Sequence, residues 1–377
     1  MKLQYSNTAP SLKRSAPERQ IGLSLIELLI AMALGLLLTL GVTQIYLSGD
    51  DSYRQTQGLS YAQESTRFVS SILKPDIRSA GSFGCLAEMG RPLDQVVENR
   101  LNAGPVVPAA QAVQGWEFDN TGPGDNTDLL PGSLFGVAGD WSSGTAGTAL
   151  PAALTGSVLV YSDVIILNAL SFVSEPTNAV TGAGQLTLAN PSDVPANRVM
   201  LATAEDCSEG ELFQKTDGAG AATITMAGAG GNPGNTSNTF NNTNYGPQTR
   251  VYEFVSTAFY VGQGTNGEPA LFRRLMTPLQ PPQELVSGVE TLQILYGVDT
   301  GGTSAADTYV AADQVNDWQD VVSVRFSVMT RSQDEVLDEP NTRNFDMLGS
   351  RFFQPNNTAD GRVRVVSVAT VAMRARM

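Results

Sequence analysis

The chain has 377 residues, and its 37 acidic side chains outnumber its 23 basic ones, which gives a formal net charge of −14. This balance argues against a nucleic-acid partner, because binding to a phosphate backbone depends on clusters of lysine and arginine. The chain contains no histidine, which removes the usual general base, the Ser-His-Asp arrangement and most zinc or iron sites. We therefore expect no enzyme, no cofactor and no bound metal.

Residues 1–22 read as a polar leader that precedes a long apolar run. The leader is mostly basic, which favours a cytoplasmic N-terminus and export of the rest of the chain. An ordinary secretory signal is a poorer interpretation, because the apolar run is longer than the roughly 7 to 15 residues of such a core and no A-x-A pattern lies close behind it. The charged side chains of the leader are Lys2, Lys13, Arg14, Glu18 and Arg19.

The apolar run predicts one membrane span over residues 23–47. No side chain between Leu28 and Leu47 is charged at neutral pH, and a helix over these residues covers roughly 30 Å, the thickness of one hydrocarbon layer. Glu27 lies at the edge of this run, where an unpaired charge costs about 2.5 to 3.5 kcal/mol. We therefore expect Glu27 to have a cationic partner, most simply an amine.

The residues around Glu27 carry a family resemblance. Gly22 followed by Leu23-Ser24-Leu25-Ile26-Glu27 resembles the type IV prepilin signal, with Leu23 where the family usually has phenylalanine. The resemblance implies that prepilin peptidase cleaves after Gly22 and N-methylates Leu23. It also implies that Glu27 attracts the N-terminal ammonium of a neighbouring subunit, a pair that fixes axial register. The alternative is a plain signal anchor whose Glu27 reaches out to the membrane interface.

The helical pattern continues beyond the membrane, so we expect one helix over about 24–74 within a stem domain of residues 23–80. Pro75 should kink or close it, and Gly81 and Gly84 end any continuation. An apolar, mostly aromatic series recurs at helical spacing and is expected to pack on the core of the head. Its members are Tyr46, Tyr53, Tyr61, Phe68 and Ile72.

Residues 81–377 are expected to form a β-rich, mostly antiparallel head, which makes the fold α+β. Alternation of apolar and polar residues is clearest where Val322, Val324, Phe326 and Val328 are interleaved with serine and arginine. Between residues 216 and 248, glycine, alanine, asparagine and threonine dominate, and we expect a flexible surface loop with little core; residues 115–150 are similar but less extreme. Strands are predicted at 158–167, 185–188, 198–202, 250–261, 270–276, 291–298, 321–330 and 363–373.

The two cysteines, Cys85 and Cys207, are expected to form a disulfide. An even pair without metal-ligand spacing, on the exported side of a bacterial membrane, most simply forms such a bond. It would close a loop of about 120 residues and contribute about 4 to 5 kcal/mol in the chain-entropy model. Two free buried thiols are the alternative.

Two further patterns are weaker. Gly262, Gly264 and Gly267 match G-x-G-x-x-G after a predicted strand, but another strand comes next where a dinucleotide site needs a helix, so we expect a hairpin turn. Asp119, Asp125 and Asp128 share a loop with asparagines, yet their spacing is not that of an EF-hand and these residue types are common in turns. We therefore assign no calcium site there.

Short phrases in scattered patches of the chain, such as Leu271-Phe272-Arg273-Arg274 and Leu295-Tyr296-Gly297-Val298-Asp299, are similar to the PilW group of minor pilins. This resemblance implies a low-abundance subunit that joins other minor pilins and the major pilin in a complex that primes pilus assembly, near the tip and with a large adhesin. It also implies a single-pass protein of the bacterial inner membrane whose head is periplasmic and later reaches the cell surface in the pilus. The alternatives are a minor pseudopilin of a type II secretion system and a membrane-anchored binding protein that never polymerises. The phrases that carry the resemblance are Asp76-Ile77-Arg78, Gly84-Cys85, Leu271-Phe272-Arg273-Arg274, Glu284-Leu285-Val286, Gly288-Val289-Glu290, Leu295-Tyr296-Gly297-Val298-Asp299 and Asp360-Gly361-Arg362.

Overall fold

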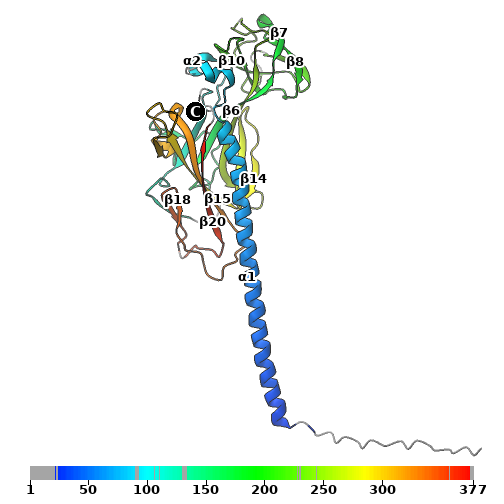
Figure 1. Ribbon diagram of the computed structural model, residues 1–377, viewed down its shortest axis with the longest axis vertical. Coiled ribbons are helices and arrows are strands. Elements are labelled where there is room, and N and C mark those ends of the chain that lie inside the picture. The colour runs from blue at the N-terminus through cyan, green and yellow to red at the C-terminus, as the bar shows by residue number, and fades with distance from the viewer. Residues whose placement is uncertain are drawn as a thin grey trace, which may run out of the picture. The chain divides into compact units, whose positions relative to one another are not determined.

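The computed structural model (Figure 1) divides into two compact units, Met1–Tyr53 and Arg54–Met377. The first helix, α1 (Leu25–Ser79), begins in the first unit and ends in the second. The structure describes residues 22, 24–89, 93–105, 107–109, 111–129, 134–226, 228, 231–242, 244–355 and 357–373.

Helix α1 confirms the prediction of one long helix. It continues through Pro75, so this proline does not close it. The helix ends at Ser79, and Gly81 comes shortly after it with a φ of +75°. That left-handed conformation is the usual way for a helix to end, and glycine adopts it without steric cost.

After α1 come short helical turns and four sheets. The turns are η1 (Gly84–Met89), α2 (Leu93–Val96), η2 (Ala138–Asp140), η3 (Thr181–Ala183), η4 (Ala312–Gln314) and η5 (Trp318–Asp320). The largest sheet contains β1 (Val97–Asn99), β10 (Gly210–Gln214), β9 (Val199–Thr203), β12 (Val251–Gln263), β6 (Val164–Ser174), β2 (Val113–Phe118), β4 (Trp141–Ser143) and β5 (Thr148–Ala149) in that order, with β13 (Pro269–Thr277) beside β12 and β14 (Gln283–Ser287) beside β13.

The other sheets have three or four strands each. Pairing is antiparallel throughout the described strands except between β1 and β10 and between β3 and β19. These sheets run β11 (Ala221–Thr225), β8 (Gln185–Ser192), β7 (Pro176–Val180); then β16 (Thr308–Val310), β15 (Val289–Val298), β17 (Val321–Arg331), β20 (Arg364–Ala372); and β18 (Phe345–Met347), β19 (Ser350–Phe353), β3 (Asn126–Asp128).

Most of the strands predicted from sequence have a counterpart within a few residues. The exception is the strand expected at 158–167, because β6 begins only at Val164 and runs on to Ser174. Asp163 precedes β6, and its carboxylate accepts hydrogen bonds from backbone N–H groups of other strands. The strand therefore begins directly after Asp163. The pattern of apolar residues alone did not indicate this starting point.

The expectation that residues 216–248 contribute little core is wrong for the described residues. This segment contains β11, and its Ile224, Met226, Phe240 and Tyr245 are buried in a cluster with strands β8 and β10. Its few apolar side chains are directed inward, while polar ones replace missing ladder bonds: the side-chain amide of Asn235 both accepts from and donates to the backbone of one residue of β10. Residues 115–150 likewise supply two buried tryptophans, Trp116 and Trp141.

The prediction that the aromatic series of α1 packs on the head is wrong for three of its five members, whereas Ile72 packs partly buried against the core and Tyr61 is half-buried. Tyr46, Tyr53 and Phe68 are exposed. The face that packs on the head consists of smaller side chains, which allow the helix backbone to approach the sheet closely. For example, the Thr330 hydroxyl of β17 donates to the carbonyl of Ala62 at 2.8 Å and lies 2.8 Å from the Thr66 hydroxyl. The buried residues of α1 are Gly58, Ala62, Ser65, Thr66, Val69, Leu73 and Ile77.

A buried carboxylate joins the largest sheet to the sheet that supports α1. Asp163, only 1% exposed, accepts a hydrogen bond from the N–H of Phe118 in β2 at 3.2 Å and from the N–H of Ile294 in β15 at 2.7 Å. Glu117 lies beside it and is also buried. Because these carboxyls are removed from water, each holds a proton more tightly than an exposed acid does.

The Tyr296 ring of β15 also lies between these two sheets. Its hydroxyl lies over Gly115, where an added Cβ atom would stand 1.8 Å from that oxygen. Tyr296 is fully buried and packs edge-on against Trp318. Glycine is therefore the residue that permits this ring to lie between the two sheets.

The buried carboxyls predict a pH dependence of stability. Burial raises the pKa of Asp163 to about 8, and burial together with the charges of Asp163 and Asp313 raises the pKa of Glu117 well above its usual range. These groups remain protonated in the folded chain at pH values where the unfolded chain has already lost their protons. Their contribution to the free energy of unfolding should therefore decrease as the pH rises from about 4 to about 8.

Glu117→Gln should therefore flatten the slope of unfolding free energy against pH, by up to about 1.4 kcal/mol per pH unit for one group. Guanidinium unfolding of both proteins across this range measures the slope. Glu175→Gln, at an exposed acid, is the matched control and should leave the slope as it is. Equal slopes for Glu117→Gln and the parent would contradict the assignment.

Candidate assembly site

The first half of α1 has the character of a membrane segment. Among the residues that the structure describes, α1 alone is long and apolar enough to cross a membrane, and none of its most apolar stretch is buried inside the chain. Large apolar side chains from Leu25 to Leu47 are exposed. An apolar surface of this extent needs lipid or another apolar helix around it.

Two threonine hydroxyls inside this stretch are satisfied within the helix itself. The Thr39 hydroxyl donates to the carbonyl of Gly35 at 2.7 Å, and the Thr43 hydroxyl donates to the carbonyl of Thr39 at 2.8 Å. An unsatisfied polar group in hydrocarbon costs several kcal/mol, and these bonds avoid that cost. These two polar side chains are therefore compatible with a lipid environment.

Glu27 lies in the first turn of α1, where the N–H groups of Glu27 and Leu28 both bond to the carbonyl of Ser24, at 3.0 and 3.1 Å. The positive end of the helix dipole favours a carboxylate in this turn. Glu27 is exposed, and within the described part of the chain no basic side chain pairs with it. This position leaves the carboxylate open to an amine from outside the described residues.

Gly22 is exposed, and an added Cβ atom there would meet no atom within 4 Å. Leu23, the expected new N-terminus, lies outside the described residues, as do the basic residues of the leader. The geometry therefore places Gly22 and Glu27 near the start of the apolar helix. Cleavage, methylation and charge pairing at these positions stay predictions.

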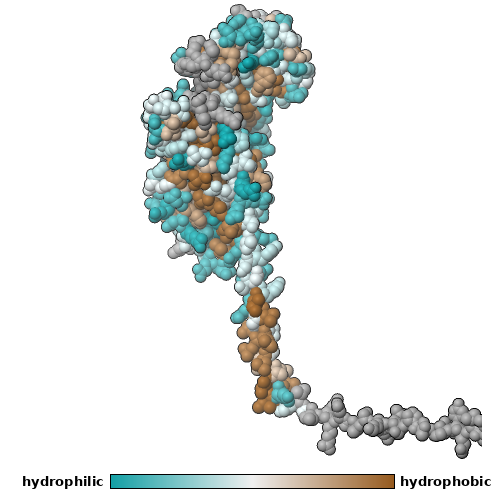
Figure 2. Space-filling model, in the orientation of Figure 1, coloured by the Kyte–Doolittle hydropathy of each residue, from teal (hydrophilic) through white to brown (hydrophobic). Residues whose placement is uncertain are grey.

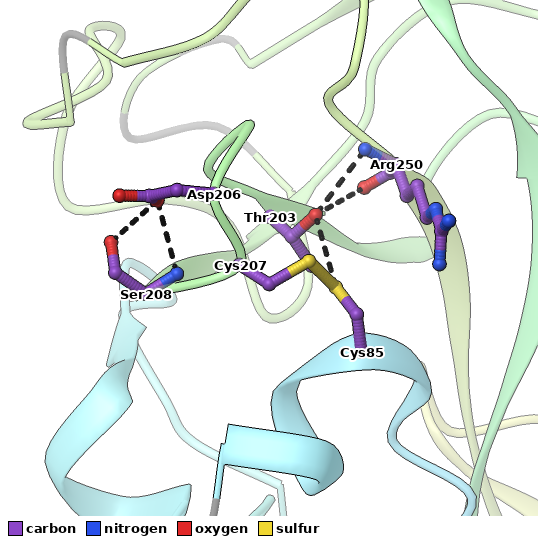
Figure 3. Close-up of a disulfide and its surroundings, with 6 residues drawn as sticks. All are labelled: Cys85, Thr203, Asp206, Cys207, Ser208 and Arg250. Atoms are coloured by element: carbon purple, nitrogen blue, oxygen red, sulfur yellow. Dashed lines mark hydrogen bonds between the residues drawn. A yellow bond between two sulfur atoms is a disulfide. The ribbon is translucent and has the colours of Figure 1, made fainter.

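Cys85 and Cys207 are joined by a disulfide with a Cα–Cα distance of 5.9 Å (Figure 3). Cys85 belongs to η1, which comes just after the end of α1, and Cys207 lies in the turn between β9 and β10. Thr203 lies beside the bond and exchanges hydrogen bonds with the backbone of Arg250. The disulfide thus ties the chain that leaves α1 to a hairpin 122 residues later.

The turn that carries Cys207 is also held by its neighbours. The Asp206 carboxylate accepts bonds from the hydroxyl and the N–H of Ser208, at 2.7 and 3.1 Å, and the first of these is the main cause that lowers the pKa of Asp206. On the other side, Gly84 has a φ of +59°, and a Cβ atom there would lie 2.5 Å from the Tyr252 hydroxyl. Both cysteines are therefore held in tight local structure.

A buried ion network was not predicted from the sequence. Arg364 in β20 contacts Glu290 at 2.6 Å and Asp360 at 2.8 Å, while Arg331 in β17 contacts Glu290 and Glu268. The network ties β20 and β17 to β15 and to the turn before β13. The signal was present in the phrases that resemble PilW, because two of them supply Glu290 and Asp360.

The structure also decides the two weaker sequence patterns. Gly262 and Gln263 are the last two residues of β12, which pairs antiparallel with β13. The N–H of Gly264 donates to the carbonyl of Glu268 just before β13, so the predicted hairpin turn is confirmed. In the described chain, no group of three or more acidic, cysteine or histidine side chains is placed to hold a metal ion. The Asp119, Asp125 and Asp128 loop therefore adds no evidence for a calcium site.

The described chain combines an apolar N-terminal helix with a mostly antiparallel, β-rich head. Residues 258–375 match the family model of PilW, the type IV pilus-assembly protein W. The match confirms the resemblance to the PilW family over this part of the chain. Most of the phrases that suggested the family lie inside it.

Comparison with individual proteins adds little. Among solved structures, a type IV-like pilin from Thermus thermophilus is 17% identical; the similarity covers 33% of this chain and 69% of that chain, with a TM-score of 0.20. No curated protein matches the chain significantly. The family-model match over residues 258–375 is therefore the comparison that bears on this chain.

The disulfide predicts a measurable contribution to stability. Replacing both cysteines by serine should lower the free energy of unfolding by about 4 to 5 kcal/mol, because the unfolded chain gains the freedom of a long loop. Guanidinium unfolding of the full chain in detergent measures the change. A reducing agent should destabilise the parent by a similar amount and leave the double variant unaffected; a parent that is equally stable with and without reductant would contradict this contribution.

Proposed function

We propose that the protein is a minor pilin that takes part in the assembly of a type IV pilus. The observation that carries the proposal is the combination, in one chain, of Gly22 and Glu27 at the start of an exposed apolar helix with a PilW-family match in the head. An apolar helix with a single carboxylate at its edge suits a segment that moves from lipid into a bundle of like helices.

In this proposal the chain is inserted in the bacterial inner membrane with its head in the periplasm. Prepilin peptidase removes residues 1–22 and methylates the new N-terminus at Leu23. The Glu27 carboxylate then pairs with the N-terminal ammonium of a neighbouring subunit, which neutralises a charge that is costly in an apolar surrounding and sets the axial position of the two helices. The apolar segments of successive subunits pack together in the filament.

The proposed partners are the other minor pilins, the major pilin and a large tip adhesin, in a complex that primes assembly. The disulfide between Cys85 and Cys207 is compatible with this location, because disulfides persist in the oxidising periplasm and at the cell surface. The proposed role is structural: the function lies in what the subunit joins.

The Glu27 role predicts a separation of processing from assembly. Glu27→Ala should leave cleavage after Gly22 intact but reduce incorporation into filaments by about tenfold or more, because the carboxylate that pairs with the neighbour is lost. Immunoblots of sheared pili against total membranes measure the ratio. Asp50→Ala, at another exposed acid of α1, is the control. Normal incorporation of Glu27→Ala would remove the assembly role from this residue.

The cleavage site predicts a discrete N-terminus. Mass spectrometry of the membrane-associated protein should find methylated Leu23 at the N-terminus only in cells that contain prepilin peptidase. Gly22→Trp should block this cleavage, because a bulky side chain stands next to the scissile bond, whereas Gly35→Ala in the apolar helix should be processed normally. A chain that retains residues 1–22 with the peptidase present would refute the proposed function.

A further inference from the structure

The end strand β20 has an edge to which no other described strand is hydrogen-bonded, although Phe345 of β18 packs in one cluster with Val366 near the start of the strand. It pairs with β17 on one side and is the last strand of its sheet. Among the described sheets it is the longest strand at an edge; the others have five residues or fewer. Between Val365 and Ala372 it contains no charge, proline or glycine, and its register with β17 is unbroken. Proteins usually protect such an edge with a charge, a proline or a bulge.

The free backbone groups of this edge can be assigned. Ser332 donates its N–H to the carbonyl of Val363, and Met373 donates its N–H to the carbonyl of Val322, so the odd-numbered residues of β20 bond to β17. Bonding alternates along an antiparallel strand. The N–H and C=O groups of the even-numbered residues Val366, Val368 and Thr370 therefore point away from β17, toward the open edge.

The side chains beside this edge are apolar on one face. Val368 is 53% exposed and lies on the same face of β20 as Val366. Figure 2 shows apolar side chains gathered on the head beside α1, where Figure 1 places β20. An added strand would cover this apolar surface with one of its two faces.

The other face of an added strand would meet α1. A groove of about 580 Å³ separates Ser367 of β20 from a turn of α1 that presents Arg67, Phe68 and Lys74, with Glu64 as its one acid. Arg67, Lys74 and the nearby Arg78 are exposed, and none of the three forms an ion pair with a described residue. In a chain of net charge −14, two cations that line one groove, Arg67 and Lys74, outnumber its single acid and have the exposed Arg78 on the same helix, which favours an acidic ligand.

We propose that the edge of β20 and the adjacent face of α1 bind an extended acidic strand of a partner pilin subunit. The strand hydrogen-bonds to Val366, Val368 and Thr370, directs its carboxylates to Arg67 and Lys74 of α1, and covers Val368 with its apolar side chains. This inference rests on the proposed function and names the kind of contact by which the subunit recognises its partner.

The test uses the full chain in detergent and a synthetic peptide of about ten residues that alternates valine and glutamate. Fluorescence anisotropy of the labelled peptide should show binding that weakens with salt, whereas a peptide that alternates valine and lysine should not bind. Val368→Pro removes only an N–H that points to the open edge, which edge strands tolerate. It should weaken binding by about tenfold or more.

A second variant guards against misfolding. Val368→Glu keeps the backbone and places a carboxylate among the apolar side chains that the acidic peptide would cover, and it should weaken binding as well, while Val137→Glu, at another exposed valine, should not. Arg67→Glu with Lys74→Glu should exchange the preference of the two peptides. Equal affinity of the parent and both Val368 variants would overturn the assignment of the edge, and loss of self-association alone in these variants would replace the acidic partner by a second copy of this chain.

These outcomes are independent of those for the proposed function. Peptide binding needs neither cleavage after Gly22 nor the Glu27 carboxylate, so a chain that retains its leader but binds the peptide at β20 would refute the pilin role and not the strand site. A chain that is processed and assembled but does not bind the peptide would refute the strand site and leave the pilin role in place.

Discussion

The close contact between α1 and strand β17 is the constraint on which the rest of the head depends. It requires small side chains where the backbones meet, and the chain supplies Ala62 and Thr66 opposite Thr330. Further along the helix, Val69, Leu73 and Ile77 enter the same core as strands β15 and β17. Because burying each such aliphatic side chain contributes about 1.5 to 3 kcal/mol, this half of α1 is held by the head and does not depend on helix propensity alone. The largest sheet is then joined to this core by Asp163, and the chain that leaves α1 is fixed by the disulfide.

Much of this architecture could be predicted because strong patterns have one interpretation. An apolar run without charges can be little other than a long helix, and strands such as β12, β15 and β17 are dense in β-branched and aromatic residues. The sequence pattern did not predict correctly which face of α1 packs on the head. The aromatic series including Tyr53 and Phe68 has the right period, but period alone does not say which face is buried. Close packing against β17 selects the face with small residues, and this selection depends on the partner strand, which a helical repeat does not reveal.

Polar residues account for most of what the sequence did not reveal. Asp163 and Glu117 were ordinary acids in the sequence, yet in the fold they are buried between two sheets. Arg364 and Glu290 are far apart in the chain and meet only because β20 returns beside β17. Such contacts depend on strand order, which hydrophobic pattern cannot fix when long segments separate the strands. The segment from 216 to 248 was misjudged for a similar reason. A few inward-facing side chains such as Phe240 attach it to the core despite its polar composition.

The candidate assembly site was predictable for a different reason: its residues are adjacent in sequence, so Gly22 and Glu27 did not need a fold to bring them together. What the fold adds is the second surface. Within the described chain, the apolar part of α1 is uncovered and the edge of β20 is unpaired, although every other long strand lies between neighbours. A protein that functions as a monomer usually protects such an edge strand with charged residues or keeps the strand short. Here Val365 to Ala372 keeps both its length and its apolar character, and the nearby cations Arg67 and Lys74 lack acidic partners among the described residues. Both surfaces are therefore explained together if burial is completed by other subunits.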